Sequence, residues 1–435
     1  MRLISLVLIY CHLVPTFNRL SDAPLGLVID FLLVITLTFY IFQKKDDNRT
    51  PKAKDIKPSF LYILLSIWMG YIFLELFNPE AKSIKAWFYA MRAMALYGWL
   101  ISLIGVKADL RKADLVKYFY VWLLIALVGG LYGIRMEIFG PLPFEKQWLA
   151  KGAYLRHILW GKLRIFSFYS DASTYGNAMG QAFVASSVLF LGPFSRNTKF
   201  KLLFCSLITL VGMSLSGTRG AYAVPGAGLL IFILITKSAS LRLVVFGSLI
   251  GVFVLLKFTY LGQSVYAIQR MRSSLDSSDP SLQVRLVNRE LLTKYLSDKP
   301  FGGGVGSSGL WGQRFTPGTY LSNFFADGGY TLIRAECGVV GKWIYIFIQL
   351  SILLRGVRFL RKTEDEKLFY FGAAIVCGFA GLLLSNYGNS TLGQFPNSMV
   401  TLFGLVFLEK MQQGLIGGEE GSEEEEADPR LEIEP

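Results

Sequence analysis

Residues 59–78, SFLYILLSIWMGYIFLELFN, decide the fold class of this chain. The stretch contains a single charged side chain, Glu75. About 20 apolar residues in a helix cross the hydrocarbon core of a bilayer, whereas helices of soluble domains alternate apolar and polar faces. The stretch therefore predicts a membrane-spanning helix.

The whole chain of 435 residues has the same character. It is 53% hydrophobic and 17% charged, with a mean hydropathy of +0.44. Soluble domains carry about 25% charged residues, so this composition excludes a disordered protein and a compact cytosolic enzyme. We predict an all-α polytopic membrane protein with about twelve transmembrane helices and a large outward-facing loop region. The apolar runs are 3–17, 25–43, 59–78, 86–105, 116–135, 173–193, 201–215, 220–236, 241–257, 330–354, 369–386 and 396–412.

Six consecutive parts follow from these runs. The segment after residue 412 carries many acidic residues and almost no apolar ones, which is typical of disorder. The parts are helices 1–5 in residues 1–135, a periplasmic loop at 136–172, helices 6–9 in 173–257, a large periplasmic loop at 258–329, helices 10–12 in 330–412, and a disordered acidic cytoplasmic tail at 413–435.

The positions of Lys and Arg predict which side each connection occupies. The connection 44–58 and the alternate short connections after it hold twenty basic residues, against four in the other short connections. Basic residues collect on the cytoplasmic side, so both termini are predicted to be cytoplasmic and both long loops to face outward. These outer loops are basic against that trend, which favours an anionic ligand outside the membrane.

Cysteine and histidine usage gives no sign of a metal site or a disulfide framework. The four cysteines show no CxxC spacing, and His12 and His157 are the only histidines. No nucleotide-binding glycine motif is present either. We therefore expect no cofactor, no metal and no nucleic-acid partner.

Two outer segments contain candidate residues for anion binding. The turn Ser216-Gly-Thr-Arg219-Gly places an arginine at the depth of the bilayer, where an ionisable side chain indicates function, the alternative being an arginine that snorkels to the interface. Guanidinium groups bind phosphate in a bidentate manner. The second segment begins at Arg164 and leads into the sixth helix, where Asp171 and Ser173 are suitable N-caps.

The large loop adds a helix and a glycine-rich run. Residues 281–296 have helical periodicity, with Arg285 and Arg289 four residues apart on one face. The run Pro300-Phe-Gly-Gly-Gly-Val-Gly follows, and its backbone amides are able to approach a ligand closely. Flexible glycine turns are the alternative.

The tenth run opens with Asp327, Tyr330, Arg334, Glu336 and Gly338. Helical spacing puts Asp327, Arg334 and Gly338 roughly on one side. Asp327 is interpreted as an N-cap of this helix, as a general base, or as both. Arg334 and Glu336 would be buried and would pair with other charges.

These segments, in this order, resemble the O-antigen ligase family, the Wzy_C superfamily of bacterial polysaccharide ligases and polymerases. The pattern Arg-x-x-Ser-Phe-x-Ser-Asp-Ala is present at 164–172, and Ser-x-Thr-Arg-Gly at 216–220. Arg285 precedes Pro300 and its glycines by the usual spacing. The closing motif fits at 327–341, although the family typically has His at the position of Asp327. The outer loop is most similar to a branch from Bacteroidetes, in which Asp is common there.

The resemblance implies an architecture like that of the GT-C glycosyltransferases. It also implies metal-independent glycosyl transfer from undecaprenyl pyrophosphate to an acceptor hydroxyl, at the periplasmic face of the bacterial inner membrane. It implies that Asp327 is the base and that Arg219 acts on the pyrophosphate. Arg164, Arg285, Arg289, Tyr330 and Arg334 would bind the pyrophosphate or the glycan. The favoured function is an O-antigen ligase acting on lipid A-core. The alternatives are a polysaccharide polymerase, a protein O-oligosaccharyltransferase, or, from another class, a glycolipid transporter or flippase.

Overall fold

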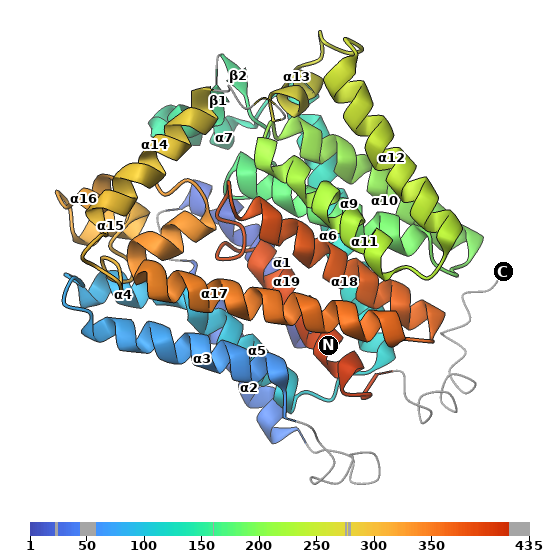
Figure 1. Cartoon of the computed structure of the whole chain (residues 1–435), viewed down its shortest axis with the longest axis horizontal. Coiled ribbons are helices and arrows are strands. Elements are labelled where there is room, and N and C mark those ends of the chain that lie inside the picture. Colours follow the sequence, from blue (N-terminus) through green and yellow to red (C-terminus); the bar gives the residue numbers. More distant parts are fainter. Residues whose placement is uncertain (22–24, 44–57, 160, 275, 277–279, 417–435) are drawn as a thin grey trace.

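The computed structural model describes residues 1–21, 25–43, 58–159, 161–274, 276 and 280–416. A helix is present at each of the twelve apolar runs (Figure 1). Outside the described residues lie the predicted acidic tail from residue 417 onward and the basic connection 44–57. The bundle helices are α1 (Arg2–Leu20), α2 (Leu27–Phe42), α3 (Phe60–Leu74), α4 (Ile84–Met91), η2 (Arg92–Leu96), α5 (Tyr97–Lys107), α6 (Lys112–Phe139), α9 (Ala172–Phe190), α10 (Arg196–Leu215), η4 (Arg219–Tyr222), α11 (Ala223–Ile235), α12 (Ala239–Phe258), α17 (Gly329–Lys362), α18 (Glu366–Ser385) and α19 (Asn397–Gln412).

Length and composition agree with an all-α polytopic membrane protein, but the count of twelve spans stays a prediction. Among the described residues, eight helical segments are long and apolar enough to cross a membrane, and α2 and Arg219–Ile235 are shorter apolar helices. The eight are Arg2–Leu20, Phe60–Phe77, Ile84–Lys107, Lys112–Phe139, Arg196–Leu215, Ala239–Phe258, Gly329–Lys362 and Glu366–Ser385.

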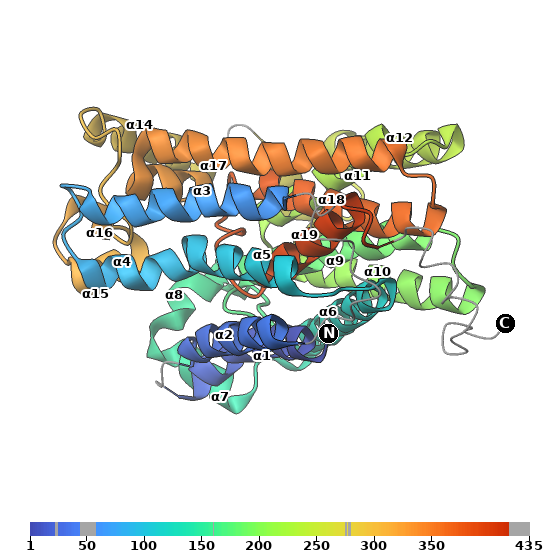
Figure 2. The ribbon, with the colours of Figure 1, turned by 90° about the horizontal axis from the view of Figure 1, so that it is seen from below.

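Helix α18 forms the centre of the bundle, and 94% of its 18-residue apolar stretch is buried. It packs against α9 and α11, and α9 packs in turn against α10 (Figures 1 and 2). Small residues permit this close approach, as in other membrane helix pairs. A Cβ on Gly381 would lie 2.4 Å from the carbonyl oxygen of Val224, and one on Gly228 would lie 2.8 Å from that of Cys377. In contrast, only 6% of the corresponding apolar stretch of α12 is buried.

The two sets of connections lie at opposite ends of the bundle. At one end, the carboxylate of Glu409 accepts from the backbone N–H of Phe60 (2.8 Å) and pairs with Arg355 (3.6 Å). There too, Lys237 donates to the carbonyl of Thr363 (2.9 Å). All of these segments belong to the set predicted to face the cytoplasm. The alternation agrees with the sequence analysis, and the choice of which end is cytoplasmic stays a prediction.

Short elements cover the other end. The first long loop folds into short helices and a two-stranded hairpin (Figure 1). In the described part of the second loop, α13 packs against α10, α12 and η4, and α14, α15 and α16 follow it along the chain. Near this end, α3 continues as η1 (Glu75–Phe77). The elements of the loops are α7 (Pro143–Trp148), η3 (Leu149–Ala153), α8 (Tyr154–His157), β1 (Ile158–Leu159), β2 (Lys162–Leu163), α13 (Tyr266–Ser273), α14 (Pro280–Tyr295), α15 (Gly309–Phe315) and α16 (Tyr320–Asn323).

Helix α17 is a hairpin of two helical halves that bends at Gly338. This glycine has φ 66° and ψ −166°, outside the helical region. In a straight helix, Tyr330 and Tyr345 would be about 22 Å apart at 1.5 Å per residue. Their ring centroids lie 6.2 Å apart, so the two halves fold back on each other. The prediction of one continuous helix from residue 330 to 354 is therefore wrong at Gly338.

Candidate functional site

The turn after α10 presents Arg219 at the start of η4. Two other arginines hold this turn by its backbone. Arg164 donates from Nη2 to the hydroxyl of Thr218 (2.7 Å) and from Nε to the carbonyl of Ser216 (3.4 Å). Arg270, from α13, donates to the carbonyl of Gly217 (3.2 Å). We call Arg164, Arg219 and Arg270 the turn arginines.

The turn arginines share one electrostatic environment. Burial lowers the pKa of Arg164; the nearby carboxylate of Asp171 raises it, whereas the charges of Arg270 and Arg219 lower it. Like charges gathered in this way are stabilised by an anion that binds between them. The sequence analysis counted Arg270 only among the basic residues of the outer loop. Its role at the turn depends on how α13 folds back, which no local pattern indicates.

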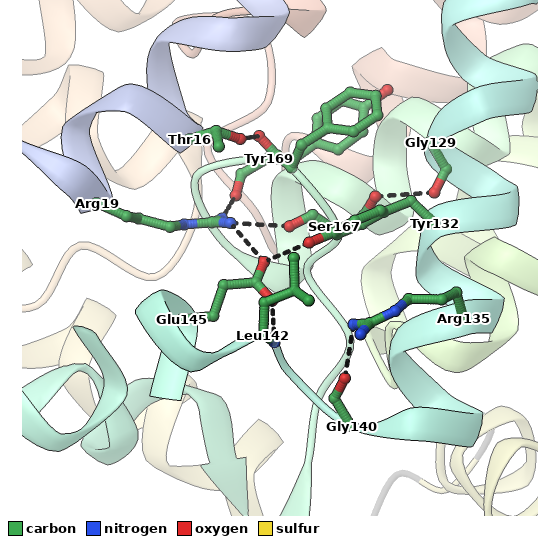
Figure 3. Close-up of polar contacts among 11 residues, drawn as sticks. Thr16, Arg19, Gly129, Tyr132, Arg135, Gly140, Leu142, Glu145, Ser167 and Tyr169 are labelled. Atoms are coloured by element: carbon green, nitrogen blue, oxygen red, sulfur yellow. Dashed lines mark hydrogen bonds and ion pairs between the residues drawn. The ribbon is translucent and has the colours of Figure 1, made fainter. Parts of the chain in front are cut away.

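The segment that follows Arg164 is fixed by a buried ion pair between Arg19 and Glu145 (Figure 3). Arg19 also donates to the carbonyls of Ser167 (2.9 Å) and Tyr169. Tyr132 donates to Glu145 (3.1 Å). Buried charges need partners of this kind, and here they set the path of the chain between Arg164 and Asp171. The sequence analysis missed Glu145, because its partner is 126 residues away.

Asp171 is the N-cap of α9, as one interpretation of the sequence predicted. Its carboxylate accepts from the backbone N–H groups of Ser173 (2.8 Å) and Thr174 (2.9 Å). Ser173 is not a cap. Its hydroxyl donates instead to the side-chain oxygen of Asn389 (2.9 Å).

Asn389 lies in the connection between α18 and α19 and is where the site segments meet. Its side-chain amide donates to the hydroxyl of Ser385 (3.1 Å). A Cβ on Gly220, the residue after Arg219, would lie 2.0 Å from that amide nitrogen. The carbonyl of Asn389 accepts from the backbone N–H of Gly329 (3.1 Å). The sequence analysis missed Asn389; the only signal was an unusually polar connection, NYGNSTLGQ at 386–394.

Asp327 lies two residues before Gly329, which donates hydrogen bonds to the connection between α18 and α19. The N-cap of α17 is Gly328, which makes no side-chain cap bond, so the N-cap interpretation of Asp327 is wrong. Gly329 donates to the carbonyl of Asn386 (2.9 Å). Within the described part of the chain, the carboxylate of Asp327 has no hydrogen bond or ion pair. The role of general base stays a prediction.

Arg285 and Arg289 of α14 reach the same connection from outside. Arg289 donates to the carbonyl of Tyr387 (2.8 Å), and its guanidinium carbon lies 3.8 Å from the centre of the Tyr387 ring. Nη1 of Arg285 lies 3.3 Å from the position of a Cβ on Gly388. The predicted shared face of these two arginines is therefore the face turned toward residues 387–388.

The remaining two candidates lie on α17. Tyr330 donates to the carbonyl of Leu383 (2.9 Å) and packs against Tyr345, which indicates a structural role. Arg334 lies in the part of the hairpin before Gly338 and is near Lys342, which lies after it. The bend at Gly338 removes the predicted alignment of Asp327, Arg334 and Gly338 on one side of a helix.

The glycine-rich run binds α17 rather than presenting free amides. The break at Gly338 leaves backbone groups of the helix unpaired, and the run satisfies them. Gly303 donates to the carbonyl of Ala335 (2.9 Å), and Val340 donates to that of Pro300 (3.3 Å). The prediction that these amides approach a ligand is thus wrong for Gly303.

Glu336 completes this contact. Its carboxylate accepts from the backbone N–H of Gly306 (2.8 Å) and from the hydroxyl of Ser308 (2.6 Å). It was predicted to pair with other charges, and among the described residues its partners are neutral donors. Glu336 therefore holds the loop against the helix.

Charged residues also lie between bundle helices. Arg92, in the π-helical segment η2, donates to Asp30 of α2 (3.1 Å) and to the hydroxyl of Tyr97 (2.9 Å). The sequence analysis missed this pair. Both side chains have partners, so the pair ties α2 to α5.

Comparisons with known proteins agree with the order of these segments. The O-antigen ligase family model matches residues 204–335. The matched range contains the Arg219 turn, α14, the glycine-rich run and Asp327, and it confirms the family resemblance. A comparison with curated proteins finds no match.

Proposed function

Because residues 204–335 match the O-antigen ligase family, we propose that this chain transfers a glycan from undecaprenyl pyrophosphate to an acceptor hydroxyl. The transfer takes place at the periplasmic face of the inner membrane, and the acceptor is lipid A-core. One observation carries the proposal: the turn with Arg219 and the segment after Asp327 both pack against Asn389. This shared contact supports a single site that contains the proposed anion-binding group and the proposed base.

In the proposed reaction, the turn arginines bind the pyrophosphate. Arg219 is the principal contact, and Arg164 and Arg270 both orient its turn and add positive charge. Guanidinium groups held in place before the reaction stabilise negative charge as it develops on a leaving group, without a cost of reorganisation. Arg285 contributes from α14 at the far side of the Asn389 connection.

Asp327 is the proposed general base. The acceptor oxygen forms a bond to the anomeric carbon while the bond from that carbon to the pyrophosphate oxygen breaks. The carboxylate of Asp327 takes the proton of the acceptor hydroxyl, and undecaprenyl pyrophosphate leaves with the electron pair. A carboxylate that has no partner among the described residues is available for this transfer, unlike that of Asp171, which is occupied as a helix cap.

The test is a glycan blot of a deletion strain that carries either the wild-type chain or Arg219→Ala. For a ligase, the variant strain keeps long glycans on the lipid carrier and loses them from lipid A-core. Single repeats on the acceptor would indicate a polymerase instead, and loss of glycans from proteins a protein O-oligosaccharyltransferase. An unchanged ladder on lipid A-core would contradict the proposal.

A further inference from the structure

We propose that Arg289, Arg334 and Lys342 form a second anion site, which binds a phosphate group of the acceptor glycolipid in the outer leaflet. We call these three residues the hairpin cations. The assignment to the acceptor rests on the proposed function; the anion site itself rests on the geometry of the α17 hairpin.

The hairpin explains why these cations are close together. Arg334 and Lys342 each lie four residues from Gly338, one in each half of α17, so the fold-back brings them together across the bend. Arg289 lies on α14 and donates to the hydroxyl of Thr331 (3.3 Å), in the part of α17 before Gly338. The charge of Lys342 is within electrostatic range of both arginines.

Among the described residues, no carboxylate forms an ion pair with any of the hairpin cations. Arg289 binds a hydroxyl, a carbonyl and an aromatic ring, all of them neutral. Lys342 lies 5.2 Å from the ring centre of Trp343. In the described part of the chain, the guanidinium group of Arg334 has no hydrogen bond or ion pair. Three like charges held together by neutral partners repel one another, and a bound anion would relieve that repulsion.

The position of the cluster favours an anion attached to a lipid. Trp343 is 60% exposed and Val339 is 44% exposed, and the same face of α17 continues through the exposed Phe347. Apolar side chains along a spanning helix face lipid, and a tryptophan beside basic residues marks the headgroup level. Basic side chains at that level also snorkel without binding a specific lipid, and the experiment separates the two roles.

The hairpin cations are distinct from the turn arginines. The charges that act on Arg164 are those of Asp171, Arg270 and Arg219, and those that act on Lys342 are Arg334 and Arg289. The connection at 385–389 contacts both clusters, through Asn389 on one side and Tyr387 on the other. Two separate phosphate sites suit a reaction between a carrier diphosphate and a phosphorylated glycolipid, with the reacting hydroxyl between them.

The experiment measures lipid retention by the purified full-length protein. Protein captured in detergent is incubated with lipid A-core, with phosphatase-treated lipid A-core, or with phosphatidylglycerol, and the bound lipid is quantified by mass spectrometry. We expect the wild-type protein to retain the phosphorylated form about tenfold more than the treated form, the size of a charge-assisted contact. The double variant Arg334→Gln/Lys342→Gln should retain both forms equally. The matched control is Lys294→Gln/Arg314→Gln, which removes two exposed outer charges and should behave as wild type.

Each outcome decides the proposal. Unchanged preference for phosphorylated lipid A-core in the double variant, with an unchanged melting temperature, overturns the site. Equal retention of phosphatidylglycerol and lipid A-core by the wild-type protein overturns the assignment to the acceptor and indicates ordinary bilayer lipid. Glycan transfer is measured in parallel. Selective retention by a wild-type protein that transfers nothing to lipid A-core would support the anion site and refute the proposed function.

Discussion

At the scale of single residues, Arg219 differs from the other two turn arginines in its position. Arg164 and Arg270 use their guanidinium groups to hold carbonyls of the turn, whereas Arg219 begins η4 directly after it. The planar fork of Arg219 is therefore the feature to test, rather than its charge alone.

Arg219→Lys keeps the charge and removes the fork, and we expect it to lower the rate of glycan transfer about 100-fold, the typical loss for one oriented donor to a developing anion. Transfer is measured with purified protein and lipid-linked glycan. The control Arg242→Lys makes the same change at an exposed position of α12 and should retain wild-type activity. Wild-type activity of Arg219→Lys would refute bidentate binding.

Asp327 can be substituted without removal of a helix cap, because the N-cap of α17 is Gly328. Asp327→Asn should lower the transfer rate about 100-fold or more, as expected for loss of a general base, and leave the melting temperature unchanged. Asp298→Asn changes an exposed carboxylate of the same loop and is the control. A fully active, normally folded Asp327→Asn protein would show that this carboxylate is not the base.

At the scale of elements, the α17 hairpin depends on one backbone conformation. Gly338 has φ 66° and ψ −166°, a conformation that costs about 1–3 kcal/mol for a residue with a side chain, and a Cβ there would lie 2.0 Å from the carbonyl oxygen of Pro300. Gly338→Ala should therefore lower the melting temperature in detergent and abolish glycan transfer. Gly247→Ala, at a helical glycine with open space around it, should change neither. Equal stability of both variants would show that the bend tolerates a side chain.

The positions of the elements were predictable from the sequence, but the hairpin was not. Each of the twelve apolar runs became a helix, because length and hydropathy are local properties. The bend at Gly338 depends on Pro300 and Gly303, which occupy the backbone groups that the break exposes. A sequence read locally shows only a glycine inside an apolar run.

The candidate site divides in the same way. Arg164, Arg285 and Arg289 were found because basic residues are unexpected in the outer loops of a membrane protein. Arg219 was found because an ionisable side chain at bilayer depth indicates function. Asn389 and Glu145 were missed, because the role of each depends on a partner far away in the sequence, here Gly329 and Arg19. Tyr330 was assigned to the substrate from family resemblance, and its hydroxyl is used by Leu383.

At the scale of the whole molecule, every part of the proposed mechanism needs one orientation in the membrane. Arg164, Arg270 and Asp327 belong to the two long loops, and Arg219 follows the turn that Arg164 and Arg270 bind. The hairpin cations lie on α14 of the large loop and on either side of the bend in α17. In the proposed mechanism the donor glycan is transferred outside the cytoplasm, so the mechanism requires the end with the two long loops to face the periplasm. The count of basic residues predicts that orientation independently of the site.

Two single cysteines test it. Ser297→Cys places an exposed thiol in the large loop, and Asn197→Cys places one in the first turn of α10, at the opposite end. The four native cysteines are buried and should stay unlabelled. In spheroplasts, a membrane-impermeant maleimide should label Ser297→Cys at once and Asn197→Cys only after permeabilisation. The reverse pattern would put the site in the cytoplasm, where the proposed donor glycan is absent, and would refute the mechanism even if every substitution in the site abolished activity.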